Sequence, residues 1–278
     1  MPEVKQHPLH TISFIDLVTA KPKASTKFYT QLLALKSKDQ NYNKVWSHAL
    51  LHRQGKRIGI IRKLPDSLKS REIPSMWVPY ISVADVNKTV ARVKDLKGNV
   101  LQEPTTIRGF AQLAIVSDPE GAVLTVWKPE SKMGFDLINE PGAYCWSELY
   151  FNDRDREIGF YTDLFGWKTK TMKMPNNVDY ITFLKDDIEV AGAMKIQEDW
   201  GKVPPNWMVY LTVENIKVAA ERVDVLKGHI EMGPIEAGDM GWFALVKDPH
   251  ETYFNIMEFK SKEKAAAPEE PKRPTVKH

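Results

Sequence analysis

The sequence predicts an α+β protein built from two tandem copies of one module, each made of two βαβββ units that form a cupped mixed sheet. Two observations carry this prediction. An internal repeat recurs at a spacing of about 130 residues, and both copies show the same order of strand-like and helix-like segments. A length of 278 residues is enough for about two domains, each with its own core.

The repeat is visible as short identical motifs in both halves of the chain. The motifs are Leu-Lys-Gly at 96–98 and 226–228, Asp-Pro at 118–119 and 248–249, and Phe-Tyr at 28–29 and 160–161. The first two pairs are 130 residues apart and the third is 132 apart, so small insertions or deletions separate them. Several identities kept in register over such a distance indicate a duplication.

Each copy begins with a strand followed by a helix. Alternating apolar and polar residues predict the strands, and apolar residues four apart, as in Ala24, Phe28 and Leu32, predict the helices. The predicted segments are strands 11–19 and 144–152 and helices 23–33 and 155–165.

Further strands and a second helix complete each copy. The predicted strands are 45–51, 57–61, 78–83 and 111–116 in the first copy, and 180–184, 190–194, 208–213 and 242–246 in the second, each copy closing with a strand after the Asp-Pro turn. Helices 86–96 and 216–226 have apolar residues three and four apart and are followed by Gly98 and Gly228. We expect these glycines to adopt the left-handed conformation that caps many helices.

The pattern predicts four regions: a first module at 1–130, a linker at 131–140, a second module at 141–260 and a charged tail at 261–278. The linker is bounded by prolines and is aperiodic. The tail lacks apolar periodicity, which predicts disorder. From residue 260 onward the chain has six Lys or Arg and three Glu, which accounts for the whole net charge of +3. A neutral body argues against nucleic-acid binding, which requires a clustered basic face.

Location and partners follow from the same composition. No apolar run reaches the roughly 18 residues that a membrane span needs, and the first residues do not resemble a signal peptide. The single cysteine, Cys145, fits a reducing compartment, so we expect a cytoplasmic protein without a membrane partner. We expect a monomer whose modules pair within the chain, or a homodimer.

The motifs carry a family resemblance over residues 10–259. CWSELYFNDRDREIGFYTDLFGW in the second copy, FYTQLLAL and DPEGAVL in the first, and the related segments WVPYISVADV and WMVYLTVENI resemble the vicinal oxygen chelate (glyoxalase/bleomycin resistance/dioxygenase) superfamily. The pattern is similar to its two-module branch, often labelled hydroxylase-like or glyoxalase-like. This resemblance implies a site on the concave face of each sheet. It indicates the fold more than the reaction, because the superfamily contains isomerases, dioxygenases, epimerases, lyases and drug-binding proteins.

The resemblance also implies three metal-ligand positions in each copy. These positions hold Phe14, Val78 and Thr125 in the first copy and Trp146, Met208 and Asn255 in the second. None is a strong ligand for a divalent cation, since Thr125 and Asn255 offer only neutral oxygen atoms. We therefore predict no metal and no cofactor.

Strand alternation predicts which side chains face the cup. If Phe14 and Trp146 face inward, so do Asp16 and Glu148. The expected catalytic residues are Glu148 and Asp16, and the expected substrate-binding residues are Phe14, Trp146, Tyr80, Tyr210, Thr125, Asn255, Tyr253 and His48. Cys145 has the opposite parity and is expected to face the helices. Trp77 and Trp207 are expected in the core or between modules.

These residues leave several functions open. A carboxylate in an aromatic cup is desolvated, which raises its pKa and suits a general acid or base, and Glu148 has the better-kept motif. Such a carboxylate can instead be held by Lys, Arg or backbone N–H groups and merely fix a strand. The candidate functions are a metal-independent enzyme acting on a small organic molecule, a non-catalytic binder of a drug or metabolite, and a metal-dependent lyase or dioxygenase with ligands displaced to Asp16, Glu148 or His48. Whether the chain is an enzyme stays open.

Overall fold

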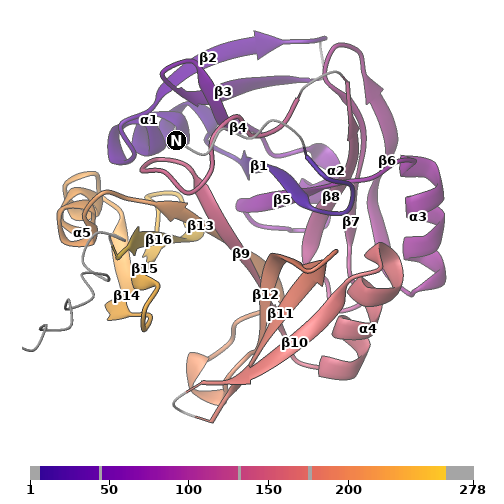
Figure 1. Cartoon of the computed structure of the whole chain (residues 1–278). Coiled ribbons are helices and arrows are strands. Elements are labelled where there is room, and N and C mark those ends of the chain that lie inside the picture. The colour runs from indigo at the N-terminus through magenta and orange to yellow at the C-terminus, as the bar shows by residue number, and fades with distance from the viewer. Residues whose placement is uncertain (1–6, 44–45, 131–132, 175–176, 261–278) are drawn as a thin grey trace, which may run out of the picture.

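The computed structural model describes residues 7–43, 46–130, 133–174 and 177–260, and it contains two eight-stranded mixed sheets (Figure 1). The strand order is β2-β3-β4-β1-β5-β8-β7-β6 in the first sheet and β10-β11-β12-β9-β13-β16-β15-β14 in the second. The predicted α+β class with two similar modules is confirmed. The predicted tail, 261–278, lies outside the described residues.

The first module consists of two βαβββ units that meet at the centre of the sheet. Its elements are β1 Ile12–Thr19, α1 Pro22–Leu32, β2 Lys36–Asn41, β3 Ser47–Arg53, β4 Lys56–Lys63, α2 Asp66–Lys69, β5 Met76–Ser82, α3 Val86–Asp95, β6 Asn99–Ile107, β7 Ala111–Ser117 and β8 Val123–Pro129. Strand β4 pairs parallel to β1 and β8 parallel to β5, whereas β1 and β5 are antiparallel.

The second module repeats this arrangement. Its elements are β9 Tyr144–Phe151, α4 Arg154–Phe165, β10 Lys168–Lys173, β11 Asp179–Lys185, β12 Ile188–Lys195, the 3-10 helix η1 Glu198–Trp200, β13 Asn206–Thr212, α5 Ile216–Val225, β14 His229–Glu236, β15 Gly241–Lys247 and β16 Tyr253–Phe259. Strands β12 and β9 are parallel, as are β13 and β16, and β9 and β13 are antiparallel. No helix in the described parts of the chain is long and apolar enough to cross a membrane.

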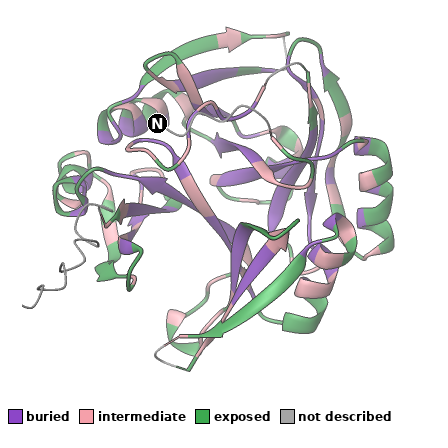
Figure 2. Ribbon diagram, viewed as in Figure 1, coloured by how far each residue is buried: buried purple, intermediate pink, exposed green. Residues whose placement is uncertain are grey.

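The strands that the sequence did not predict are the four sheet edges, β2, β6, β10 and β14. An edge strand with few buried residues has little apolar alternation to reveal it. Strand β10 is the extreme case, because all six of its residues are exposed (Figure 2).

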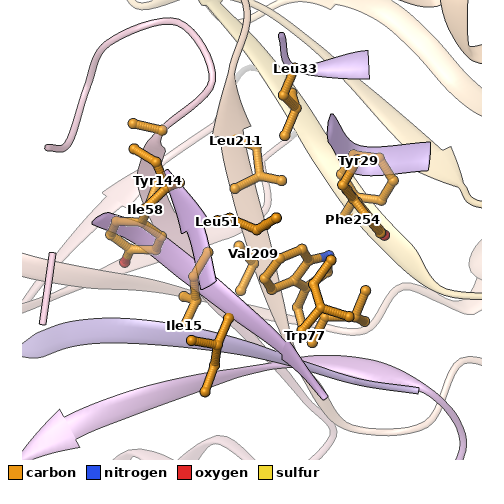
Figure 3. Close-up of a cluster of buried hydrophobic side chains, with 14 of the residues drawn as sticks. Ile15, Tyr29, Leu33, Leu51, Ile58, Trp77, Tyr144, Val209, Leu211 and Phe254 are labelled. Atoms are coloured by element: carbon orange, nitrogen blue, oxygen red, sulfur yellow. The ribbon is translucent and has the colours of Figure 1, made fainter. Parts of the chain in front are cut away.

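The modules exchange equivalent contacts across a pseudo-twofold interface. The hydroxyl group of Tyr29 on α1 donates to Asp248 of the second module at 3.2 Å, and that of Tyr161 on α4 donates to Asp118 of the first at 2.9 Å. Each tyrosine ring also meets a tryptophan edge to face, Trp77 or Trp207. Figure 3 shows Tyr29, Trp77 and Phe254 in one of these buried clusters. The expectation that both tryptophans lie in the core or between modules is confirmed.

The prediction that Gly98 and Gly228 provide left-handed helix caps is wrong. The left-handed residues are Lys97 and Lys227, with φ of 68° and 65°. A Cβ atom on Gly98 would lie 2.9 Å from the Phe160 ring of the other module, and one on Gly228 would lie 3.2 Å from the Phe28 ring. The glycines therefore leave room for the phenylalanine ring of the other module's Phe-Tyr motif to pack against them.

The segment between the two sheets is packed against the first module. The Phe135 ring stacks on Tyr144 with centroids 4.7 Å apart, and Asp136 pairs with Arg57 at 2.7 Å. Phe135 is also 5.7 Å from the Phe14 ring, so this segment helps to cover one end of the first sheet.

Candidate functional site

The two predicted carboxylates lie at equivalent positions at the centres of the two sheets. Asp16 on β1 pairs with Ile60 on β4, and Glu148 on β9 pairs with Gly192 on β12. We call the sheet surfaces that carry them the Asp16 face and the Glu148 face. Strand register assigns further equivalences between the faces: Phe14 with Trp146, Tyr80 with Tyr210, Thr125 with Asn255, His48 with Tyr180, Arg62 with Met194, and Val18 with Tyr150.

On the Asp16 face, a buried ion pair neutralises the carboxylate. The Arg62 Nε atom donates to Asp16 Oδ2 at 2.5 Å, and the Tyr80 hydroxyl donates to the same oxygen at 2.9 Å. The Arg62 guanidinium also lies 4.3 Å from the centre of the Trp46 ring. Burial raises the pKa of Asp16, while Arg62 and Tyr80 oppose that rise. This arrangement matches the structural role considered for these carboxylates.

The rest of the Asp16 face is filled by its own side chains. Phe14 stacks on Trp127 at 5.7 Å, and the Phe110 ring lies 5.8 Å from Trp127. His48 is buried against Phe110, and neither ring nitrogen has a hydrogen-bond partner among the described residues. Burial and the nearby Arg62 lower the pKa of His48 to about 4. A neutral, packed histidine of this kind is better suited to a core than to proton transfer.

On the Glu148 face, tyrosine hydroxyl groups take the place of the arginine. The Tyr180 hydroxyl donates to Glu148 Oε1 at 2.7 Å. The hydroxyl groups of Tyr210 and Tyr150 donate to Oε2 at 2.5 Å and 3.1 Å. The Trp146 indole N–H donates to the Tyr180 hydroxyl at 2.9 Å, which fixes that oxygen in place. No Lys or Arg in the described parts of the chain forms an ion pair with Glu148.

A glycine makes room for this hydrogen-bond network. A Cβ atom on Gly192 would lie 2.1 Å from the Tyr180 hydroxyl oxygen and 2.9 Å from Trp146 Nε1. The first sheet has Ile60 at this position, whose side chain fills the equivalent space. Gly192 is therefore required where Tyr180 reaches Glu148.

Burial and hydrogen bonding act on the acidity of Glu148 in opposite directions. Desolvation raises the pKa of this carboxyl group above its usual value, and the three tyrosine hydroxyl groups offset part of the rise. Desolvation and the nearby carboxylate raise the pKa of Tyr180, Tyr150 and Tyr210, so these hydroxyl groups remain protonated. A buried carboxylate with a raised pKa and several fixed donors suits proton transfer.

The Glu148 face is more open to solvent than the Asp16 face. Phe14, Tyr80 and Thr125 are fully buried, whereas Trp146, Tyr150 and Tyr180 are only half-buried. The predicted residue Tyr253 is 43% exposed at the edge of the face, beside Lys247. Trp200 of η1 packs edge to face against Tyr150 with centroids 5.1 Å apart.

The prediction that Cys145 faces the helices is wrong. The register of β9 and β13 shifts beside Cys145, and this irregularity breaks the strict alternation on which the prediction relied. The thiol packs with Met208, Tyr210 and Met257 on the Glu148 face. Desolvation raises the pKa of Cys145 to about 12, so the thiol is not poised to act as a nucleophile.

Several residues of this site were not selected from the sequence. Tyr180, Gly192 and Trp200 shape the surroundings of Glu148, and Arg62 neutralises Asp16. Strand alternation places Tyr150 two residues after Glu148, on the same face. Tyr180 and Gly192 depend on the register between strands, which the sequence alone does not fix.

The residues present do not fit a divalent metal ion at the positions that the fold family implies. Those six positions hold no His, Cys, Asp or Glu. The described residues contain no group of three or more such side chains that could hold a metal. Both Glu148 oxygen atoms already accept hydrogen bonds from tyrosine hydroxyl groups. A metal ion on this face would therefore find one carboxylate, already hydrogen-bonded, as its anionic ligand among the described residues.

A separate groove of about 480 Å³ lies where the modules meet, and it contains none of the predicted site residues. It lies between the end of α1 and the start of α5, beside Pro141. The Arg53 guanidinium in this groove donates to the Pro141 carbonyl and is thus already engaged.

The sequence of the chain is similar to several named proteins. It is 27% identical over 260 residues to the "Putative glyoxylase CFP32" of Mycobacterium tuberculosis, covering 92% of this chain and 98% of that protein. It is 28% identical over 195 residues to the anthracycline biosynthesis protein DauV of a Streptomyces species (strain C5), covering 70% of each chain.

The fold is similar to that of two enzymes of low sequence identity. The Mn(II)-bound glyoxalase from Novosphingobium aromaticivorans matches with a TM-score of 0.60 at 15% identity, covering 90% of this chain and 82% of that one. The 2,2',3-trihydroxybiphenyl 1,2-dioxygenase from Sphingomonas wittichii matches with a TM-score of 0.60 at 13% identity, covering 90% and 91%. The model of the Glyoxalase/Bleomycin resistance protein/Dioxygenase superfamily matches residues 11–126, and the second module repeats the same strand order. The chain is therefore similar to that superfamily, and the family model covers its first module.

Proposed function

We propose that the Glu148 face binds a small organic molecule and that Glu148 exchanges a proton with it. One observation carries the proposal: Glu148 is buried, has no cationic partner among the described residues, is held by three tyrosine hydroxyl groups, and lies among half-buried aromatic rings. The equivalent Asp16 is neutralised by Arg62 inside a packed face. We therefore assign the function to the second module.

The proposed chemistry is removal of a proton next to a carbonyl group. The C–H bond of the substrate breaks, its electron pair moves toward the carbonyl carbon and oxygen, and the proton moves to a Glu148 oxygen. A tyrosine hydroxyl that donates to Glu148 in the free protein turns to the developing negative oxygen. Return of the proton from Glu148 to carbon or oxygen completes the reaction, so no oxidant is required.

The relatives support a small organic ligand. One is named for glyoxylase activity and another for biosynthesis of anthracyclines, which are small organic compounds. Apolar side chains from neighbouring strands, including Met208, Met257, Phe243 and Leu245, offer a surface for an apolar ligand body.

Exchange of carbon-bound hydrogen for deuterium tests the proposal. The protein would be incubated in D₂O with 2-hydroxyacetophenone and related aryl ketones, and deuterium at the carbon beside the carbonyl would be followed by NMR. We expect Glu148→Gln to slow the exchange by about 10²-fold or more. Glu103→Gln, which removes an exposed carboxylate of the first module, is the matched control and should exchange normally. Equal rates in the wild type and Glu148→Gln would refute the role of Glu148.

Non-catalytic binding is the second candidate function. The observation that favours it is that the tyrosine hydroxyl groups already satisfy both Glu148 oxygen atoms, and aromatic rings outnumber titratable groups on this face. Binding of the ketones without any exchange in the wild type would support this candidate over the first.

A further inference from the structure

We infer that the Glu148 face selects an organic cation: an ammonium group carried on an apolar body. The inference rests on the proposed function, since it names the class of molecule that this face binds. It follows from the charge of the face, its unused hydrogen-bonding capacity and its aromatic rings.

The charge of Glu148 is not compensated within the described residues. Lys247 on β15 pairs with Glu231 at 3.1 Å and with Glu251 at 3.5 Å, and Lys260, which follows β16, pairs with Glu236 at 2.6 Å. The tyrosine hydroxyl groups supply dipoles but no positive charge. A carboxylate or phosphate ligand would therefore meet repulsion, whereas a cation would supply the missing counter-charge.

The unused hydrogen-bonding capacity of the face is that of an acceptor. Asn255 is 1% exposed, and its Oδ1 atom has no hydrogen-bond partner among the described residues. The three tyrosine hydroxyl groups are committed as donors to Glu148. A ligand that donates hydrogen bonds fits this arrangement, and an ammonium group has donors and no acceptors.

Aromatic rings surround the carboxylate on several elements. Trp146 and Tyr150 come from β9, Tyr180 from β11 and Tyr210 from β13, and Trp200 of η1 packs on Tyr150. Ring faces attract cations, and an ammonium group gains from rings and a carboxylate together. Met208 and Met257 lie in the same cluster and provide adaptable apolar contacts for the rest of the ligand.

Three probes with one apolar body and different charges test this inference: 2-phenylethylammonium, 2-phenylethanol and 3-phenylpropanoate. Their affinities for the full-length protein would be measured at pH 7.5 by isothermal titration calorimetry and by quenching of tryptophan fluorescence. We expect the cation to bind about tenfold more tightly than the alcohol, and the carboxylate to bind most weakly. Equal affinities, tighter binding of the carboxylate, or no binding of the cation would overturn the inference.

Variants locate the preference and separate it from the proton-transfer proposal. Glu148→Gln should bring the cation to the affinity of the alcohol, and Trp200→Ala, at a half-buried position, should weaken the cation severalfold more than the alcohol. Glu103→Gln should leave all three affinities unchanged. A cation preference that survives Glu148→Gln would place the site elsewhere and overturn the inference. If deuterium exchange depends on Glu148 but the protein shows no preference for the cation, the cation inference is overturned and the proton-transfer proposal stands. If the protein prefers the cation but catalyses no exchange, only the proton-transfer proposal is overturned.

Discussion

The Asp16 face and the Glu148 face have the same strand order and register but treat a buried carboxylate in opposite ways. Arg62 neutralises Asp16, whereas the equivalent residue beside Glu148 is Met194, and no described residue supplies a cation there. The first face is closed by its own aromatic rings, and the second keeps rings in contact with solvent. The comparison teaches that one scaffold supports either a structural ion pair or a buried carboxylate held by tyrosine hydroxyl groups, depending on the residues beside the carboxylate.

A second difference involves space rather than charge. Ile60 occupies the position of Gly192, and His48 that of Tyr180. The isoleucine fills the first face, whereas the glycine admits a tyrosine hydroxyl to the second. Charge and volume thus change together between the two copies.

Breaking the ion pair of the first face should produce the largest effect. Arg62→Met gives this face the residue found in the second and leaves Asp16 buried without a cation. We expect a loss of about 3–5 kcal/mol in the free energy of unfolding, measured by urea denaturation at pH 7. The double variant Asp16→Asn with Arg62→Met should recover part of this loss. A single variant as stable as the wild type would mean that the ion pair does not hold the face together.

Acid should weaken the first face through His48. Burial lowers the pKa of His48 to about 4, so its contribution to stability is present above pH 6.5 and is lost as the pH falls toward 4. His48→Phe keeps a ring and removes two unpaired nitrogens. It should be more stable than the wild type by about 2 kcal/mol at pH 4.5, with a smaller difference at pH 7.5. Parallel curves of unfolding free energy against pH would contradict this expectation.

Filling the space at Gly192 should make the second face resemble the first. In Gly192→Ala the new methyl group would lie 2.1 Å from the Tyr180 hydroxyl oxygen, so that side chain must move from Glu148. We expect a cost of about 1–3 kcal/mol in thermal unfolding. Gly159→Ala is the control, because nothing lies within 4 Å of that added atom. On helix α4 it should stabilise the protein by about 1 kcal/mol. Equal effects of the two variants would refute the steric role of Gly192.

The smallest expected effect is a pH dependence of opposite sign in the second face. Desolvation raises the pKa of Glu148, so the stability that this group contributes is present below about pH 4.3 and is lost as the pH rises through its raised pKa. Glu148→Gln should therefore gain stability relative to the wild type as the pH rises from 5 to 8. Urea denaturation of both proteins at the same pH values measures this difference in unfolding free energy. If the stability gain of Glu148→Gln instead increases as the pH falls, the pKa of Glu148 is lowered rather than raised.

The sequence predicts the interior of this fold better than its edges. Strand alternation and repeated motifs identify the central strands and the main helices, because each has a buried face that constrains its residues. Edge strand β10 carries no such pattern, since all its residues are exposed. The Phe-Tyr and Leu-Lys-Gly motifs, which reveal the internal repeat, build the contact between the modules.

The candidate site was predictable only along single strands. Alternation is enough to place Asp16 and Glu148 on corresponding faces, and it also places Tyr150 beside Glu148, but the other partners of the two carboxylates lie on other strands. Arg62 and Tyr180 reach the carboxylates through strand pairing, and the register shift at Cys145 reverses the expected parity. Such cross-strand relations depend on folding of the whole sheet.

The exchanged Tyr29–Asp248 and Tyr161–Asp118 contacts make the chain equivalent to a dimer whose subunits have been joined. Joining them removes the requirement that both copies remain identical, which a true homodimer imposes on every site. One copy retains the closed, neutral centre, and the other is free to change its centre without duplicating the change. Under the proposed assignment, a saturating ligand should therefore occupy one site per chain, half the stoichiometry of a symmetric pair of modules.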